Sequence, residues 1–169
     1  MSQDAAQSQA NQIHCAVVTG GARNIGQAIA LRLQKDGYRV IVVDIVEPEA
    51  QSLQADAHQV DLSDADATRR VMLDISERFQ VTRLINNVGI VAPALIEEAQ
   101  LEDFDKLMHL NVRSALICTQ SLLPNMKANG KGRIVLNTSA YQRQVSLTPP
   151  EGKDFRFPGP LLRRMTAEQ

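Results

Sequence analysis

The chain has 169 residues, of which 44% are hydrophobic and 22% charged, and its 18 basic side chains nearly balance its 19 acidic ones. This composition is typical of one globular domain, and it excludes a wholly disordered chain and a nucleic-acid-binding protein built on a large basic surface. No apolar run approaches the roughly 18 residues needed to cross a bilayer, and residues 1–12 form a polar leader. We therefore expect a soluble, cytoplasmic protein with neither a membrane nor a nucleic-acid partner.

The first predicted elements are a buried strand, a helix and a second buried strand. Residues 14–19 form a short apolar run that ends at a pair of glycines, which is typical of a strand followed by a turn. Residues 40–43 are β-branched with no polar alternation, as expected for a parallel strand covered on both faces. The helix between them should end at Asp36-Gly37. Its apolar stripe is expected to contain Ile25, Ala28, Ile29 and Leu33.

The alternation of strands and helices continues to residue 136. We expect strands at 58–60, 83–86 and 133–136, and helices at 48–55, from Ser63 onward, and at 102–126. The apolar stripe predicted for the helix that opens at Ser63 consists of Ala67, Val71, Ile75 and Phe79. This order predicts an α/β fold, in which a doubly wound parallel sheet of about five strands in the order 3-2-1-4-5 has helices on both faces.

The turn between the first strand and its helix reads Thr-Gly-Gly-Ala-Arg-Asn-Ile-Gly over residues 19–26. Backbone amides and the helix dipole at such a turn favour a phosphate group. Gly20 allows the tight turn and Gly26 lets the helix approach the strand. Asn24, between them, is a residue type that tolerates a positive φ. The alternative is an ordinary glycine-rich turn without a ligand. The expected cofactor-binding residues of this turn are Gly20, Arg23, Asn24, Ile25 and Gly26.

Asp44 follows the second buried strand, close to the offset of about 20 residues at which an acidic side chain binds the ribose 2′-hydroxyl of NAD. Its carboxylate would repel the 2′-phosphate of NADP, so the sequence favours NAD. Arg23 supplies a cation nearby, which leaves NADP open. The alternative interpretation of Asp44 is a solvated strand end.

These motifs resemble those of the classical short-chain dehydrogenase/reductase family. Residues 19–26 are similar to the family's TGxxxGxG fingerprint, and residues 86–89 are similar to its NNAG segment. Asp61-Leu62 resembles the family's adenine-contacting pair, and Asn111 stands where the family has a helical catalytic asparagine. Residues 132–139 resemble the strand that ends at the catalytic serine, here Ser139.

The resemblance covers roughly residues 13–140 and implies a Rossmann-type fold. It also implies that a bound nicotinamide dinucleotide exchanges hydride with a small carbonyl or alcohol substrate. The residues that it implicates are Ser139 and Asn111 as catalytic, and Asp61, Leu62, Asn87 and Gly89 as additional cofactor contacts.

Asn111 can also be interpreted without the resemblance. It lies in the predicted helix at 102–126 on a stripe shared with apolar residues, so its amide is expected to point towards the core and to need hydrogen-bond partners there. A structural asparagine bonded to a neighbouring turn is the alternative. The apolar members of the stripe are Phe104, Leu107, Met108 and Ala115.

The family's acid/base pair, Tyr-x-x-x-Lys, has no counterpart in this chain. The pair is expected about a dozen residues after the serine, where residues 151–154 read Glu-Gly-Lys-Asp. The two tyrosines, Tyr38 and Tyr141, are followed four positions later by Val42 and Val145. An unassisted tyrosine has a pKa near 10, so its ionisation at neutral pH costs roughly 4 kcal/mol.

The cysteines and histidines lack metal-binding spacing. Cys15 and Cys118 lie far apart in apolar segments, and we expect both thiols to be buried. The three histidines are scattered, so no metal site is expected.

From residue 142 onward the chain changes character, because it holds four of the seven prolines and no extended helix or strand pattern. We expect three regions: the polar leader 1–12, a dinucleotide-binding domain 13–140 and an irregular tail 141–169. The family's further strands would lie beyond the end of the chain, which would leave the fifth strand as an exposed edge rich in Ile and Val.

Three functional hypotheses follow. We favour a chain of oxidoreductase lineage that is truncated and inactive in this form. The alternatives are an active reductase with a different acid/base group, and a non-enzymatic module that binds a partner through the exposed sheet edge. The expected partners are a dinucleotide, a small substrate if the chain is active, and a second copy in a homo-oligomer.

Overall fold

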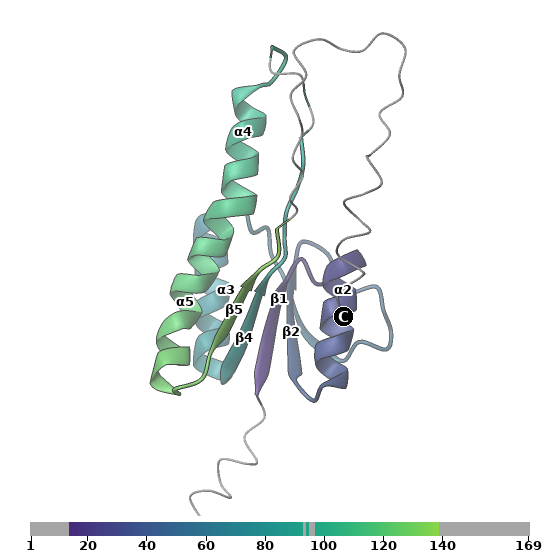
Figure 1. Ribbon diagram of the computed structural model, residues 1–169, viewed down its shortest axis with the longest axis vertical. Helices are drawn as coiled ribbons and strands as arrows, with labels where there is room; N and C mark the ends of the chain where they lie inside the picture. Colours follow the sequence, from purple (N-terminus) through teal and green to yellow (C-terminus); the bar gives the residue numbers. More distant parts are fainter. Residues whose placement is uncertain (1–13, 93, 95–96, 139–169) are drawn as a thin grey trace, which may run out of the picture. The chain divides into compact units, whose positions relative to one another are not determined.

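The computed structural model describes residues 14–92, 94 and 97–138, which form one five-stranded parallel sheet (Figure 1). The strand order is β3-β2-β1-β4-β5, so the predicted order is confirmed. The predicted leader, the predicted tail and Ser139 lie outside the described residues. The strands are β1 (Cys15–Thr19), β2 (Arg39–Asp44), β3 (Ala55–Gln59), β4 (Val81–Asn86) and β5 (Arg133–Leu136).

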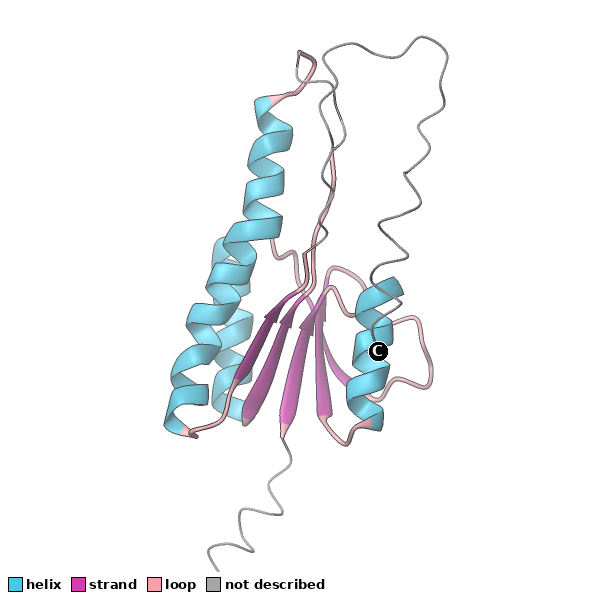
Figure 2. Ribbon diagram, viewed as in Figure 1, coloured by secondary structure: helices cyan, strands magenta, loops and turns pink. Residues whose placement is uncertain are grey.

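Helices cover both faces of the sheet, as predicted (Figure 2). Helix α2 lies on one face, and α3 and α5 lie side by side on the other (Figure 1). A π-helical segment joins α4 to α5, so residues 101–128 are helical throughout. The bounds are α2 (Asn24–Lys35), α3 (Ala65–Arg78), α4 (Leu101–Leu107), the π-helix (Met108–Arg113) and α5 (Ser114–Ala128).

Strand β1 is the centre of the core because it has β2 on one side and β4 on the other. All five of its side chains are buried. Successive side chains of a strand point to opposite faces. Accordingly, Val17 joins the apolar cluster under α3 and α5, whereas Val18 joins the cluster under α2.

The buried face of α2 agrees only in part with the predicted one. Gly26 and Ala30 are its fully buried residues, whereas Ile25 is 67% exposed and Ala28 is also exposed. A glycine and an alanine face the sheet because the helix lies very close to β1. Ile29 and Leu33 of the predicted stripe pack against the cluster under α2 as expected, whereas Ile25 and Ala28 lie outside the buried face.

The helix predicted at 48–55 is absent, and the strand predicted at 58–60 begins earlier, at Ala55. The side chain of Gln34 satisfies backbone groups of this connection, donating to the Ser52 carbonyl at 3.0 Å and accepting from the Gln54 amide at 2.6 Å. Leu53 inserts into the cluster under α2. Val46 and Ala50 pack against the same cluster, and the Glu49 amide donates to the Ala22 carbonyl at 3.2 Å. Side-chain bonds and apolar contacts therefore hold the connection in place of a helix.

Helix α3 begins two residues after Ser63, because Asp64 is its N-cap and accepts from the amides of Asp66 and Ala67. Of the predicted stripe, Ile75 and Phe79 are buried in the core and Val71 packs against it. The buried face of the helix also includes Thr68 and Met72, which the stripe did not contain. Thr68 is compatible with burial because its hydroxyl donates to the Leu62 and Asp64 carbonyls.

The two cysteines are buried, as predicted. Burial raises the pKa of the Cys118 thiol to about 12, so it stays protonated at neutral pH. Within the described part of the chain, no helix combines the length and apolar character needed to span a membrane.

Candidate functional site

The loop between β1 and α2 has a backbone conformation that few residues tolerate. Gly20 has φ of 62°, and Asn24 is the one described residue with a side chain that has a positive φ, at 49°. A Cβ atom on Gly26 would lie 1.9 Å from the Gly20 carbonyl oxygen and 2.6 Å from Nδ2 of Asn87. The loop therefore requires glycine at position 26 and favours asparagine at 24, in agreement with the predicted roles of these residues.

Helix α2 has no side-chain cap at its amino end. Its N-cap is Arg23, whose carbonyl accepts the first helical bond, from the Gln27 amide at 3.0 Å. The first amides of a helix have no partner within the helix and carry the positive end of its dipole. This arrangement fits an anionic group such as a phosphate.

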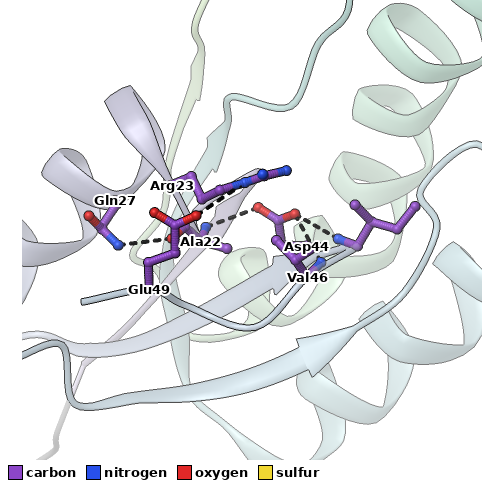
Figure 3. A network of polar contacts seen from close by, with 7 residues as sticks. Ala22, Arg23, Gln27, Asp44, Val46 and Glu49 are labelled. Atoms are coloured by element: carbon purple, nitrogen blue, oxygen red, sulfur yellow. Dashed lines mark hydrogen bonds and ion pairs between the residues drawn. The ribbon is translucent and has the colours of Figure 1, made fainter. Parts of the chain in front are cut away.

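Asp44 holds the glycine-rich loop against the end of β2 (Figure 3). Its Oδ2 accepts from the Ala22 amide at 2.9 Å, and its Oδ1 accepts from the Ile45 amide at 2.7 Å and the Val46 amide at 3.3 Å. A carboxylate offers about four acceptor positions, so the described contacts leave room for one more donor. The partly buried side chain is thus a loop anchor that can still accept a hydroxyl.

Arg23 points away from Ala22 and reaches the region between Asp44 and Glu49 (Figure 3). Its Nε lies 3.9 Å from the Glu49 carboxylate, and both side chains are at least half exposed. An exposed ion pair at this distance contributes little free energy. The Arg23 guanidinium is therefore free to turn towards an anion. The Ile25 side chain is apolar and largely exposed, so any phosphate contact from this residue would come from its backbone.

Thr19 and Asn87 join the ends of β1 and β4. The Thr19 hydroxyl accepts from the amides of Asn87 and Val88, at 3.0 and 3.2 Å. The Asn87 side chain donates to the Thr19 and Gly20 carbonyls and accepts from Nδ2 of Asn137, which follows β5. Asn87 was predicted as a cofactor contact; its described bonds fix three strand ends relative to one another.

Asn111 lies in the π-helical segment and is exposed, so the prediction that its amide points into the core is wrong. Its Oδ1 accepts from the Ile90 amide at 2.8 Å, and its Nδ2 donates to the Ile90 carbonyl at 2.9 Å. This is the alternative that the sequence left open, an asparagine bonded to a neighbouring turn. A Cβ on Gly89 would lie 3.3 Å from Oδ1 of Asn111, so the glycine lets the loop approach the helix closely.

Asp61 and Leu62 form the turn before α3. The Asp61 carboxylate accepts from the Ser63 amide at 2.8 Å and is exposed, whereas Leu62 is buried in the core under α3 and α5. A contact from Leu62 to an adenine would therefore use its backbone. Arg113 of the π-helical segment donates to the Ser63 carbonyl at 2.6 Å and ties this turn to the helix that carries Asn111.

The sheet brings most of the predicted site residues to one edge. The loop after β1, Asp44 at the end of β2, and Asn87 and Gly89 after β4 all lie at the carboxyl ends of parallel strands. Ligands of open α/β sheets bind at this edge, where the strand order reverses between β1 and its two neighbours. Sequence reasoning missed Thr19, Asn137 and Arg113, because nothing in a sequence pattern marks which strand ends a hydroxyl, amide or guanidinium will join.

Comparison with known proteins identifies the family. Residues 14–148 match the sequence profile described as short chain dehydrogenase. The chain belongs to the short-chain dehydrogenase family. The resemblance inferred from the motifs is therefore confirmed, as is the Rossmann-type fold.

Curated relatives in this family include reductases. The chain is 28% identical over 135 residues to the 3-oxoacyl-(acyl-carrier-protein) reductase of Staphylococcus epidermidis, covering 73% of this chain and 55% of the relative. It is 33% identical over 120 residues to dehydrogenase/reductase SDR family member 6 of Rattus norvegicus, covering 70% and 49%. The chain spans about half the length of these relatives.

Solved structures of short-chain dehydrogenases have the same fold. A putative NAD(P)-dependent gluconate 5-dehydrogenase from Beutenbergia cavernae, with bound NADP, has a TM-score of 0.68 and 29% identity, over 73% of this chain and 53% of that chain. A metagenomic short-chain oxidoreductase in complex with NADP has a TM-score of 0.66 and 27% identity, over 72% and 60%.

Proposed function

We propose that this chain binds a nicotinamide dinucleotide at the carboxyl edge of its sheet and does not turn over substrate in this form. The observation that carries the first part is the β1–α2 loop, in which an uncapped helix start follows a backbone that requires Gly26. The free helix amides would hold the pyrophosphate, Asp44 the adenosine ribose, and the Asp61–Leu62 turn the adenine. When bound, such a cofactor supplies or accepts hydride.

NAD is the preferred dinucleotide in this proposal. The Asp44 carboxylate has an acceptor position left for a ribose hydroxyl, and a phosphate at the same place would meet a negative charge. Arg23, held only by a long ion pair, would instead favour the 2′-phosphate of NADP. The two structural relatives above contain NADP. The charge at position 44 and the freedom of Arg23 therefore decide the preference.

Calorimetric titration of both cofactors tests this preference. Native protein should bind NAD more tightly than NADP, and Asp44→Asn, which removes the charge and keeps one acceptor oxygen, should lower the NAD/NADP affinity ratio about tenfold, or about 1.4 kcal/mol. Asp44→Ala should do the same and also weaken both cofactors, because it frees the loop. Glu77→Gln, at an exposed site on α3, is the matched control. Tighter NADP binding by the native chain, or an unchanged ratio in Asp44→Asn, would refute the assignment.

The absence of turnover is proposed from the missing acid/base pair. Ser139 and Asn111 occupy two of the family's catalytic positions, and the region where Tyr-x-x-x-Lys is expected reads Glu-Gly-Lys-Asp. Hydride transfer to a carbonyl needs a proton donor, and loss of general acid catalysis alone costs on the order of 10² to 10⁴ in rate.

Purified chain should therefore show no reduction above background with NADH or NADPH and a panel of ketones and aldehydes. Oxidation of secondary alcohols, the reverse reaction, should likewise show no rate above background. A robust rate that disappears in Ser139→Ala would favour the alternative of an active reductase with a different acid.

A second candidate function, protein binding at the edge of the sheet, is favoured by a separate observation. Among the described residues no strand pairs with the outer side of β5, and all four of its residues are exposed. The apolar side chains Ile134, Val135 and Leu136 make this edge attractive to a further strand.

A further inference from the structure

The Arg23 side chain extends between two carboxylates, those of Asp44 and Glu49 (Figure 3). The Asp44 carboxylate uses both of its oxygens to accept from backbone amides. The Glu49 carboxylate lies 3.9 Å from Nε of Arg23, and this is the ion pair that Arg23 makes among the described residues. Glu49 is therefore the acidic residue that competes with any bound anion for the Arg23 guanidinium.

The backbone fixes the position of Glu49, although its side chain is exposed. The Glu49 amide donates to the Ala22 carbonyl at 3.2 Å, and the Ala22 amide donates to Asp44 at 2.9 Å. Ala22 itself is buried and directly precedes Arg23. The next residue along, Ala50, packs against the apolar cluster under α2. One buried peptide unit thus holds positions 23, 44 and 49 close together.

Negative charge is concentrated at the end of β2 and in the connection that follows it. Asp44 and Glu49 together carry two negative charges, against the single positive charge of Arg23. The first turn of α2, in contrast, contains no acidic residue. A pyrophosphate at the helix start would therefore meet no acidic side chain from that turn. A further phosphate on the adenosine ribose, beside Asp44, would meet the net negative charge.

We propose that Glu49 is a specificity-determining residue, which disfavours NADP by pairing with Arg23. This inference rests on the proposed dinucleotide site and adds a residue to its selectivity. To bind a 2′-phosphate, Arg23 would have to leave Glu49, and the released carboxylate would remain near the phosphate. A ribose 2′-hydroxyl requires neither change, so NAD binding is independent of Glu49.

The expected effect of Glu49 is smaller than that of Asp44. An exposed ion pair changes an equilibrium by up to about fivefold, and the repulsion of the phosphate by the released carboxylate adds to this. We therefore expect Glu49 to lower the affinity for NADP by about three- to tenfold. Asp44 determines the preference for NAD, and Glu49 increases it.

Calorimetric titration of NAD and NADP tests the proposal on the full chain. Glu49→Gln should strengthen NADP binding about three- to tenfold and change NAD binding less than about twofold. The matched control is Glu47→Gln, which removes an exposed charge from the same connection but makes none of the ion pairs among the described residues. Its effect on the ratio of the two affinities should stay below about twofold. Equal changes of the ratio in the two variants would overturn the role of Glu49.

The ratio of the two affinities separates specificity from a structural role. A variant that only loosened the glycine-rich loop would weaken NAD and NADP together and leave the ratio unchanged. That result for Glu49→Gln would overturn the proposal.

A double-mutant cycle tests whether Glu49 acts through Arg23. In an Arg23→Met background, Glu49→Gln should change NADP affinity less than about twofold, because the guanidinium that it releases is missing. In an Arg23→Lys background, which keeps the positive charge, most of the effect should remain. If the full effect of Glu49→Gln persists in Arg23→Met, the ion pair is not the cause and the proposal fails.

The Nε–H resonance of Arg23 reports the ion pair without any cofactor. It is identified by its absence from the spectrum of Arg23→Met. Glu49→Gln should shift this resonance, whereas Glu47→Gln should leave it in place. An unchanged resonance in Glu49→Gln would overturn the pairing.

Failure of this proposal can be distinguished from failure of the proposed function. If the native chain binds NAD and Glu49→Gln leaves the NAD/NADP ratio unchanged, only the assignment of Glu49 is refuted. If the native chain binds neither dinucleotide, the proposed function is refuted, and the assignment of Glu49 with it.

Discussion

The candidate site depends on the absence of a side chain at Gly26. The backbone of α2 passes so close to the end of β1 that a methyl group at this position would overlap the Gly20 carbonyl. The required space is created by the tight turn at Gly20, which itself needs a positive φ. The close approach places the uncapped helix start directly after the strand end, where a phosphate would bind.

Replacing Gly26 by alanine should therefore destabilise the protein by about 3 kcal/mol or more, because backbone atoms must move to relieve the overlap. Urea unfolding measures this cost. Gly37→Ala is the control: Gly37 has φ of 86° but open space around it, so only conformational strain of about 1 kcal/mol is expected. Similar costs for the two substitutions would show that the predicted overlap is relieved at no penalty.

Asp64 provides a pH-dependent contribution to stability. The pKa of the Asp64 carboxyl is lower than its usual value. The main cause is the hydrogen bond from the Ala67 amide, and the bond from the Asp66 amide adds to it. A carboxyl group whose pKa is lower in the folded than in the unfolded state stabilises the fold above the unfolded pKa of about 3.9, and this contribution is lost as the pH falls through the folded pKa.

Asp64→Asn should accordingly reduce the free energy of unfolding at neutral pH, and the difference from the native chain should vanish in acid, well below about pH 4. Denaturant unfolding at a series of pH values measures it. Glu77→Gln, which removes an exposed carboxylate from the same helix, should show no such dependence. A difference that persists unchanged in acid would contradict the assigned role of the charge.

The helical stretch 101–128 is the element with the most direct effect on the candidate site. Its π-helical segment shifts the helix register where Asn111 and Arg113 are located. Such segments are rare and are frequently found at functional sites. Here the shift lets Asn111 hold the loop after β4 while Arg113 holds the turn before α3. One irregular turn thus connects two loops of the proposed dinucleotide site.

Asn111→Leu should release the Ile90 loop, with an expected cost of about 1 to 2 kcal/mol for two hydrogen bonds. Native-state hydrogen exchange reports this directly, since the Ile90 amide should exchange faster. Asn111→Asp keeps an acceptor for the Ile90 amide and loses the donor to its carbonyl, so an intermediate effect is expected. Unchanged exchange at Ile90 in the leucine variant would show that the loop is held by other contacts.

How far the elements could be predicted depends on where they lie in the sheet. Strands β1 and β2 are buried on both faces, and their continuous apolar runs identified them directly. Strand β3 lies at an edge and contains Asp56 and His58, so its first residues gave no apolar signal. The apolar faces of α2 and α3 were predicted only in part, because Gly26 and Thr68, which occupy buried positions, do not count as large apolar residues in a periodicity pattern.

The residues of the candidate site that the sequence predicted most directly are those whose type is restricted by backbone conformation. Gly20, Asn24 and Gly26 could be found because a positive φ or a close approach limits the choice of side chain. The bonds of Thr19 with the loop after β4 span more than 65 positions in the chain and depend on strand order and register together. No local pattern contains that information.

The two edges of the described sheet differ in their protection. Strand β3 carries Asp56, which pairs with Arg39 of the neighbouring strand, and charged side chains discourage the addition of further strands. Strand β5 has one charged residue followed by three exposed apolar ones. Within the described part of the chain, one edge of the sheet thus carries an ion pair and the other carries exposed apolar side chains, with the proposed dinucleotide loops at the carboxyl ends between them.

The central position of β1 has a consequence for how the protein is made. A ribosome adds roughly 5 to 20 residues per second, so β4 emerges several seconds after β2. During that interval β1 can pair with β2, but its other side, destined for β4, stays open along a strand whose side chains all end up buried. The nascent chain therefore passes through a stage with an exposed apolar strand, and binding by a chaperone at that stage would protect it from aggregation.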